Sequence, residues 1–202
     1  MAVNLTLNKT IAALPTEEAL TVWNLTYSRF MELITAPYHH KDMIWIVLPL
    51  VTALFLMQLY FGRYKKEELG WNTAVGNSLA LIFVAVDLTR QIYLNSASTT
   101  VFNFIFDNFS KVMIVFILGI VSFWLLFGEF FHLFPKKFAF LISSSLPTTL
   151  IAYLAIILIY TKIPIDFSIL LASLMMFIVL TILFKIIHML EPAFRERIRL
   201  NK

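Results

Sequence analysis

The 202-residue chain is 60% hydrophobic and only 14% charged, whereas soluble domains are roughly 45–50% apolar and about 25% charged. This composition predicts an integral membrane protein, and at about 20 residues per crossing the length leaves no room for a sizeable soluble domain. The chain has no cysteine, which excludes disulfides, thiolate metal sites and cysteine nucleophiles, and its net charge of +4 is expected from cytoplasmic Lys and Arg rather than from nucleic-acid binding.

The N-terminal segment, residues 1–42, precedes the first long apolar run and is expected to lie outside the cell. Its apolar residues Leu20, Trp23, Tyr27, Phe30 and Ile34 recur at helical spacing, opposite Glu17, Thr21, Asn24, Ser28 and Glu32. We predict an amphipathic helix that opens at Pro15 and places these apolar residues at the interface or against the bundle. Acidic residues before the apolar run argue against a cleavable signal peptide, so we expect the mature chain to start near Met1.

Five apolar stretches have the length of a membrane span: 43–61, 73–94, 112–134, 138–160 and 167–190. We predict an all-α, polytopic bundle of five transmembrane helices over 43–190, followed by a basic cytoplasmic tail, 191–202. A short interfacial helix is expected before the third span, where Val101, Phe102, Ile105, Phe106 and Phe109 oppose Asn103, Asp107 and Asn108.

The distribution of basic residues predicts the orientation. Nine Lys and Arg lie in the segments on one side of the five spans and five lie on the other, so the richer side is expected to be cytoplasmic. The four N-x-S/T sequons, at Asn4, Asn8, Asn24 and Asn108, all fall on the opposite side, where glycosylation occurs. We therefore expect a multi-pass protein of the plasma membrane with its N-terminus outside and its C-terminus in the cytoplasm.

The second span carries an intramembrane polar face that includes Asn77, Asp87, Arg90 and Gln91. A lone carboxylate inside the bilayer costs roughly 2.5–3.5 kcal/mol on insertion scales, and Arg90, three residues on, is the expected partner of Asp87. We favour the interpretation that this face holds helices together. The alternative is that it lines a hydrated path.

The stretch SSSLPTT lies in the middle of the fourth span. Pro147 cannot donate a hydrogen bond to the carbonyl of Ser143, and the hydroxyls of Ser143, Ser144 and Ser145 can re-satisfy freed backbone groups. A kink is therefore predicted at mid-bilayer. We favour a structural kink over a gate or a binding element.

Two pairs of possible metal ligands lie near the cytoplasmic ends of the third and fifth spans. Glu129 and His132 are three residues apart, as are His188 and Glu191, and all four could bind zinc or iron if these spans were neighbours. We predict that they do not all converge, and that the histidines are interfacial anchors beside Lys136 and Lys185. No cofactor is predicted.

The sequence contains no H-E-x-x-H, G-x-S-x-G, Walker or G-x-G-x-x-G motif, which argues against the common catalytic and nucleotide-binding classes. We favour a non-enzymatic scaffold or accessory subunit, with the lipid bilayer and either other membrane proteins or further copies of this chain as partners. A small ion or solute transporter or channel is the second hypothesis. An intramembrane metalloenzyme is the third.

Overall fold

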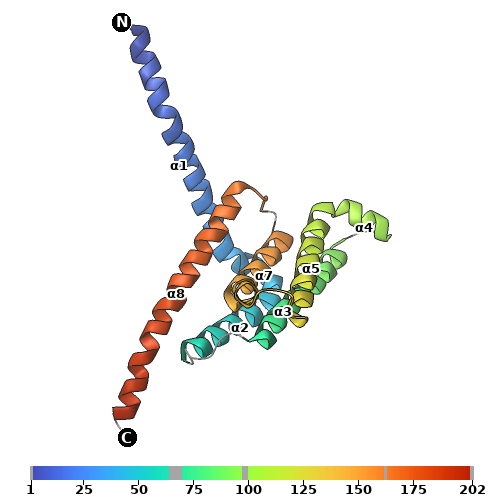
Figure 1. Ribbon diagram of the computed structural model, residues 1–202. Coiled ribbons are helices and arrows are strands. Elements are labelled where there is room, and N and C mark those ends of the chain that lie inside the picture. The colour runs from blue at the N-terminus through green and yellow to red at the C-terminus, as the bar shows by residue number, and fades with distance from the viewer. Residues whose placement is uncertain (1, 64–69, 97–99, 162, 201–202) are drawn as a thin grey trace.

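The computed structural model describes the backbone of residues 2–63, 70–96, 100–161 and 163–200, and within these ranges the side chains of residues 21–189 (Figure 1). The described helices are α1 (Ala2–His39), the 3-10 helix η1 (Lys41–Met43), α2 (Ile44–Arg63), α3 (Trp71–Leu94), α4 (Val101–Asp107), α5 (Phe109–Phe130), α6 (Lys136–Ile142), α7 (Ser145–Tyr160) and α8 (Phe167–Leu200). The predicted all-α class is confirmed.

The helices also confirm a membrane protein. Four stretches are long and apolar enough to cross a bilayer: Lys41–Arg63, Trp71–Leu94, Phe109–Phe130 and Phe167–Met189. The helices α6 and α7 meet this condition together, with a 44° bend between them, and make up the fifth predicted span. The described bundle therefore agrees with five spans, close to the bounds read from the apolar runs.

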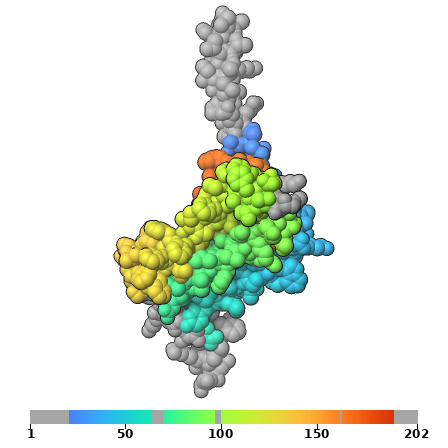
Figure 2. Space-filling view, turned by 90° about the vertical axis from the view of Figure 1, so that its right-hand side faces the viewer, coloured from blue at the N-terminus to red at the C-terminus, as the bar shows by residue number. Residues whose placement is uncertain are grey.

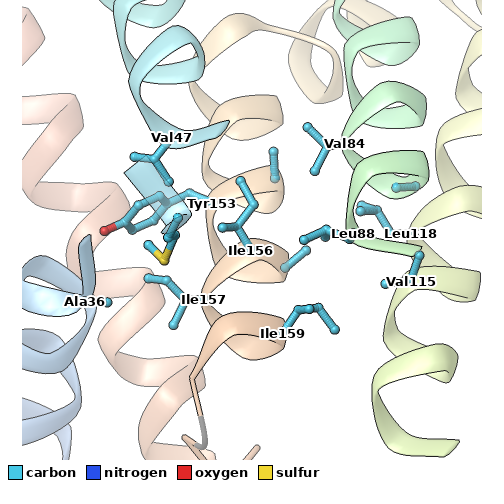
Figure 3. Packing of buried hydrophobic residues seen from close by; sticks show 14 of the residues in the cluster. Ala36, Val47, Val84, Leu88, Val115, Leu118, Tyr153, Ile156, Ile157 and Ile159 are labelled. Carbon is cyan, nitrogen blue, oxygen red and sulfur yellow. The ribbon is translucent and has the colours of Figure 1, made fainter. Parts of the chain in front are cut away.

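The core is built around α7, which lies in the middle of the bundle (Figure 1). Tyr153, Ile156, Ile157 and Ile159 of this helix are buried in one cluster with side chains of α1, α2, α3, α5 and α8. The partners labelled in Figure 3 are Val84 and Leu88 of α3, Val115 and Leu118 of α5, Val47 of α2 and Ala36 of α1. Because α7 is surrounded, the bend at its first residue is held inside the protein.

The helix α1 begins at Ala2 rather than near Pro15. Of the two places predicted for its apolar face, at the interface or against the bundle, the second does not hold for Trp23 and Tyr27. Trp23 is 61% exposed and Tyr27 54%, whereas Thr26, Leu33 and Ala36 are buried. Ile34 is exposed as well, Phe30 is half-buried, and the side chain of Leu20 lies outside the described residues. In a membrane protein large apolar side chains face lipid, and small or polar residues let helices approach closely.

Polar contacts connect α1 to the end of α7 and the start of α8. The hydroxyl of Tyr153 donates to the carbonyl of Leu33 at 2.6 Å. Arg29 lies 2.8 Å from Glu32 and 3.3 Å from Asp166, and its hydrogen bond to Glu32 raises the pKa of the guanidinium, with Asp166 adding to the effect. Asp166 also accepts from the backbone N–H of Ile169, at 2.8 Å, as the N-cap of α8.

The short helix α4 occurs where it was predicted, but its apolar face does not pack on the bundle. All five apolar residues assigned to that face are exposed: Val101, Phe102, Ile105, Phe106 and Phe109. Phe104 is the half-buried residue, and its ring packs edge-on against Tyr93 with centroids 5.8 Å apart. The apolar face thus points away from the protein, as expected for a helix whose large side chains enter lipid.

Candidate functional site

The fourth span breaks at Ser143 and Ser144, between α6 and α7. Proline in the first turn of α7 leaves the Ser143 carbonyl without its usual helical donor. The side chain of Asn77, on α3, supplies this donor, with Nδ2 2.6 Å from the carbonyl oxygen. The predicted kink is therefore present, and a neighbouring helix rather than a local hydroxyl satisfies the carbonyl that Pro147 frees.

The carboxylate of Glu129 lies beside this break and is completely buried, with 0% of the residue exposed. The Ser78 hydroxyl, on α3, donates to Oε2 at 2.7 Å, and the Ser143 hydroxyl donates to Oε1. We call Glu129, Asn77, Ser78 and Ser143 the Glu129 cluster. It joins α3, α5 and the broken fourth span at one acidic group.

Glu129 is the second-last residue of α5, whereas the two serines that bond to it lie farther along α3 and the fourth span. Ser78 is seven residues after Trp71, the first residue of α3, and Ser143 is seven residues after Lys136, the first of α6. At about 1.5 Å per residue, both lie roughly 10 Å from those helix starts. No Lys, Arg or His among the described residues forms an ion pair with Glu129, so its hydrogen-bond donors are neutral.

Asp87 and Arg90 lie at a different level of the bundle. Asp87 Oδ1 is 3.2 Å from Arg90 Nη2, and the side chains are 33% and 67% exposed. Asp87 is ten residues beyond Asn77 on the same helix, about 15 Å along its axis. Gln91 is half-buried beside the pair. The structure thus separates the polar face of the second span into an Asp87–Arg90 pair and the residues that meet Glu129.

The other serines of the break have different contacts. The Ser144 hydroxyl donates to the carbonyl of Leu141 at 3.1 Å. The Ser145 hydroxyl is buried and has no hydrogen-bond partner within the described part of the chain. Of the three predicted serines, Ser143 alone contacts Glu129.

The described members of the predicted metal set do not meet. His132 is exposed and stacks on Trp71 with ring centroids 4.3 Å apart, and His188 Nε2 lies 2.8 Å from the carbonyl of Gln58. The side chain of Glu191 lies outside the described residues. Residues 21–189, where described, contain no group of three or more His, Cys, Asp or Glu side chains placed to hold a metal ion.

A tight turn after α5 fixes the position of Glu129. The N–H of His132 donates to the carbonyl of Glu129 at 3.2 Å, and the N–H of Leu133 donates to that of Gly128 at 2.7 Å. These two bonds form a Schellman cap, whose left-handed position is held by His132, with φ 54°, instead of the usual glycine. The turn carries the chain back past α5, where Phe134 packs on Gly128.

Glu129, Asn77 and Ser143 were identified from the sequence but assigned to three different features, and Ser78 was missed. A usable signal was present in Gly76-Asn77-Ser78, where small and polar residues interrupt an apolar span. Comparison with protein-family models, with curated proteins and with solved structures finds no match.

Proposed function

We propose that this protein transports a small monovalent cation, a proton or an alkali-metal ion, and that Glu129 binds it. The observation that carries the proposal is a fully buried carboxylate held only by neutral donors at the break in a membrane span. An uncompensated charge in this environment costs several kcal/mol, on the order of 2.5 or more, and a bound proton or cation removes that cost.

The composition of the Glu129 cluster suits such an ion. Two carboxylate oxygens and the hydroxyl oxygens of Ser78 and Ser143 are hard donors, which prefer hard cations to soft transition metals. Ion sites of secondary transporters are commonly built at broken helices, where backbone carbonyls are freed. At the bend between α6 and α7, the hydroxyl of Ser143 bonds to Glu129 and its carbonyl bonds to Asn77 instead of to a donor within the helix.

The test is ion flux in vesicles reconstituted with purified protein, under an imposed proton or sodium gradient. We expect the ion flux of wild type to exceed that of protein-free vesicles. The flux should be lost in Glu129→Gln, which keeps the size of the side chain but has no carboxylate to bind a proton or a cation. Asp87→Asn is the matched control, a neutralised carboxylate on another level of the bundle, and should retain the flux. Equal flux in wild type and Glu129→Gln, or no flux in wild type with either ion, would reject the proposal.

A scaffold or accessory subunit is the second candidate, and a separate observation favours it. Both oxygens of Glu129 are already occupied by protein hydroxyls, which is also how a purely structural tie between three helices is built. In addition, α1 and α8 extend beyond the bundle in opposite directions (Figure 1), where other membrane proteins or further copies of this chain could pack. Absence of flux in a folded wild type, with a defined oligomer or complex isolated from native membranes, would favour this function.

We also propose an orientation in the plasma membrane with the N-terminus outside, supported by the excess of Lys and Arg on the other side. Single cysteines at Asn24 and Ile165, both exposed, are expected to react with an impermeant thiol reagent applied to intact cells. Cysteines at Arg63 and Lys136 should react only after permeabilisation. The reverse labelling pattern would invert the topology.

The same orientation leaves the sequons outside, and their surroundings differ. Asn24 is exposed, whereas the Asn108 amide donates to Ser96 Oγ and to the Phe104 carbonyl, each at 3.3 Å. The side chains of Asn4 and Asn8 lie outside the described residues. If the host glycosylates surface proteins, Asn24 is therefore the better acceptor of the two described sites.

A further inference from the structure

A groove runs along the surface between α3 and α5, under α4, toward the C-terminal end of α3. It consists of two adjoining hollows of about 240 and 390 Å³ that share Val86, Thr89 and Phe104. The three helices lie side by side on the face turned toward the viewer in Figure 2. The walls are apolar apart from Thr89 and one charged residue, Arg90.

The groove has the length of one lipid leaflet. Its wall on α3 extends from Ile82 to Tyr93, eleven residues or about 16 Å, and its wall on α5 extends from Val112 to Gly119. Half of a bilayer's hydrocarbon core is about 15 Å thick. Phe104 and Tyr93 form an aromatic wall at the end nearest the helix termini.

A cationic side chain, that of Arg90, lies at the same end of the groove. Arg90 lines the wider hollow, is 67% exposed, and uses one terminal nitrogen, Nη2, at 3.2 Å from Asp87. A guanidinium has five N–H donors in a planar fork, so this contact leaves donors for a further anion, and the fork matches a phosphate group. Asp87, one turn deeper, holds the guanidinium beside the groove.

We infer that the groove binds a phospholipid, with an acyl chain between α3 and α5 and the phosphate on Arg90. Charge complementarity between guanidinium and phosphate, an apolar channel of leaflet length and an aromatic wall near the interface all select this one class of ligand. This site is independent of the proposed transport function, since it shares no residue with the Glu129 cluster.

The test is the amount of lipid phosphorus that stays with the protein after extensive washing in detergent, with native mass spectrometry to count bound molecules. We expect roughly one phospholipid per wild-type chain, because the groove has room for one acyl chain and one cation for the phosphate. Arg90→Gln should lower the amount of retained phospholipid about tenfold, because it removes one charge-assisted contact with the phosphate. Arg90→Lys keeps the charge and should lower the retained amount by less. Lys111→Gln removes another cation from the same end of the bundle and should change nothing.

Gly119→Leu tests the groove without touching its charge. A Cβ at Gly119 meets no atom within 4 Å, so the larger side chain should fit into the hollow and displace the acyl chain. Gly76→Leu is the matched control, since a Cβ there also meets nothing and Gly76 does not line the groove. If either test variant misfolds, the other decides. Equal retention in all folded variants, or a groove filled by a second copy of the chain without lipid, would overturn the inference.

Discussion

Replacing Glu129 by alanine is expected to lower the free energy of unfolding by roughly 2–4 kcal/mol. The substitution takes the acceptor away from two buried hydroxyls, Ser78 and Ser143, and each unsatisfied buried donor costs about 1–3 kcal/mol. Part of this loss is recovered, because a helical serine can turn to a carbonyl four residues back, as Ser122 does to Leu118 at 2.6 Å. Thermal or detergent-induced unfolding of the purified protein measures the change.

Graded variants separate hydrogen bonding from charge in this prediction. Glu129→Gln keeps one acceptor oxygen and should lose only about half of the alanine effect, roughly 1–2 kcal/mol. Glu32→Ala is the control, because it removes a carboxylate whose ion pair with Arg29 is only partly buried and should cost about 1 kcal/mol or less. A gain in stability in Glu129→Ala would contradict the prediction, since it would mean that burying the carboxylate costs more than its hydrogen bonds return.

The number and position of the spans follow from the sequence because each span must be about 20 apolar residues long whatever it packs against. The direction in which helix faces point does not follow as simply. The amphipathic pattern of α1 predicted Trp23 and Tyr27 either at the interface or against the bundle, and the residues buried against the bundle include Thr26 and Ala36 instead. In lipid, large apolar residues have no preference for the protein interior, so the pattern alone cannot choose between the two faces.

The site was predictable in parts. The carbonyl freed by Pro147 needs a hydrogen-bond donor, and this could be predicted. Only the packing of α3 against the break identifies Asn77 as that donor. Glu129 was placed near the end of the third span, and it is the second-last residue of α5. Its contact with the break was not predicted, because the Schellman turn that folds the chain back after α5 has His132 at the position where glycine is usual.

Gly128→Ala is expected to destabilise the protein by about 1–3 kcal/mol, although alanine normally stabilises a helix relative to glycine by roughly 0.5–1 kcal/mol. A Cβ at position 128 would overlap the ring of Phe134. That ring packs against Trp124, with centroids 4.6 Å apart, and against Phe138, at 5.7 Å, so it cannot move aside without disturbing both neighbours. Phe138 belongs to α6, and displacing it shifts the helix that leads to Ser143.

Two other helical glycines, Gly119 and Gly76, provide the control for this substitution. A Cβ at Gly119, on the same helix, or at Gly76, on α3, meets no atom within 4 Å, so alanine at either position should be neutral or stabilising. In a double-mutant cycle, Phe134→Ala should remove most of the cost of Gly128→Ala, because the overlapping ring is then absent. If Gly128→Ala unfolds at the same temperature as Gly119→Ala, Phe134 does not rest on Gly128, and the turn that positions Glu129 is held by its two backbone hydrogen bonds alone.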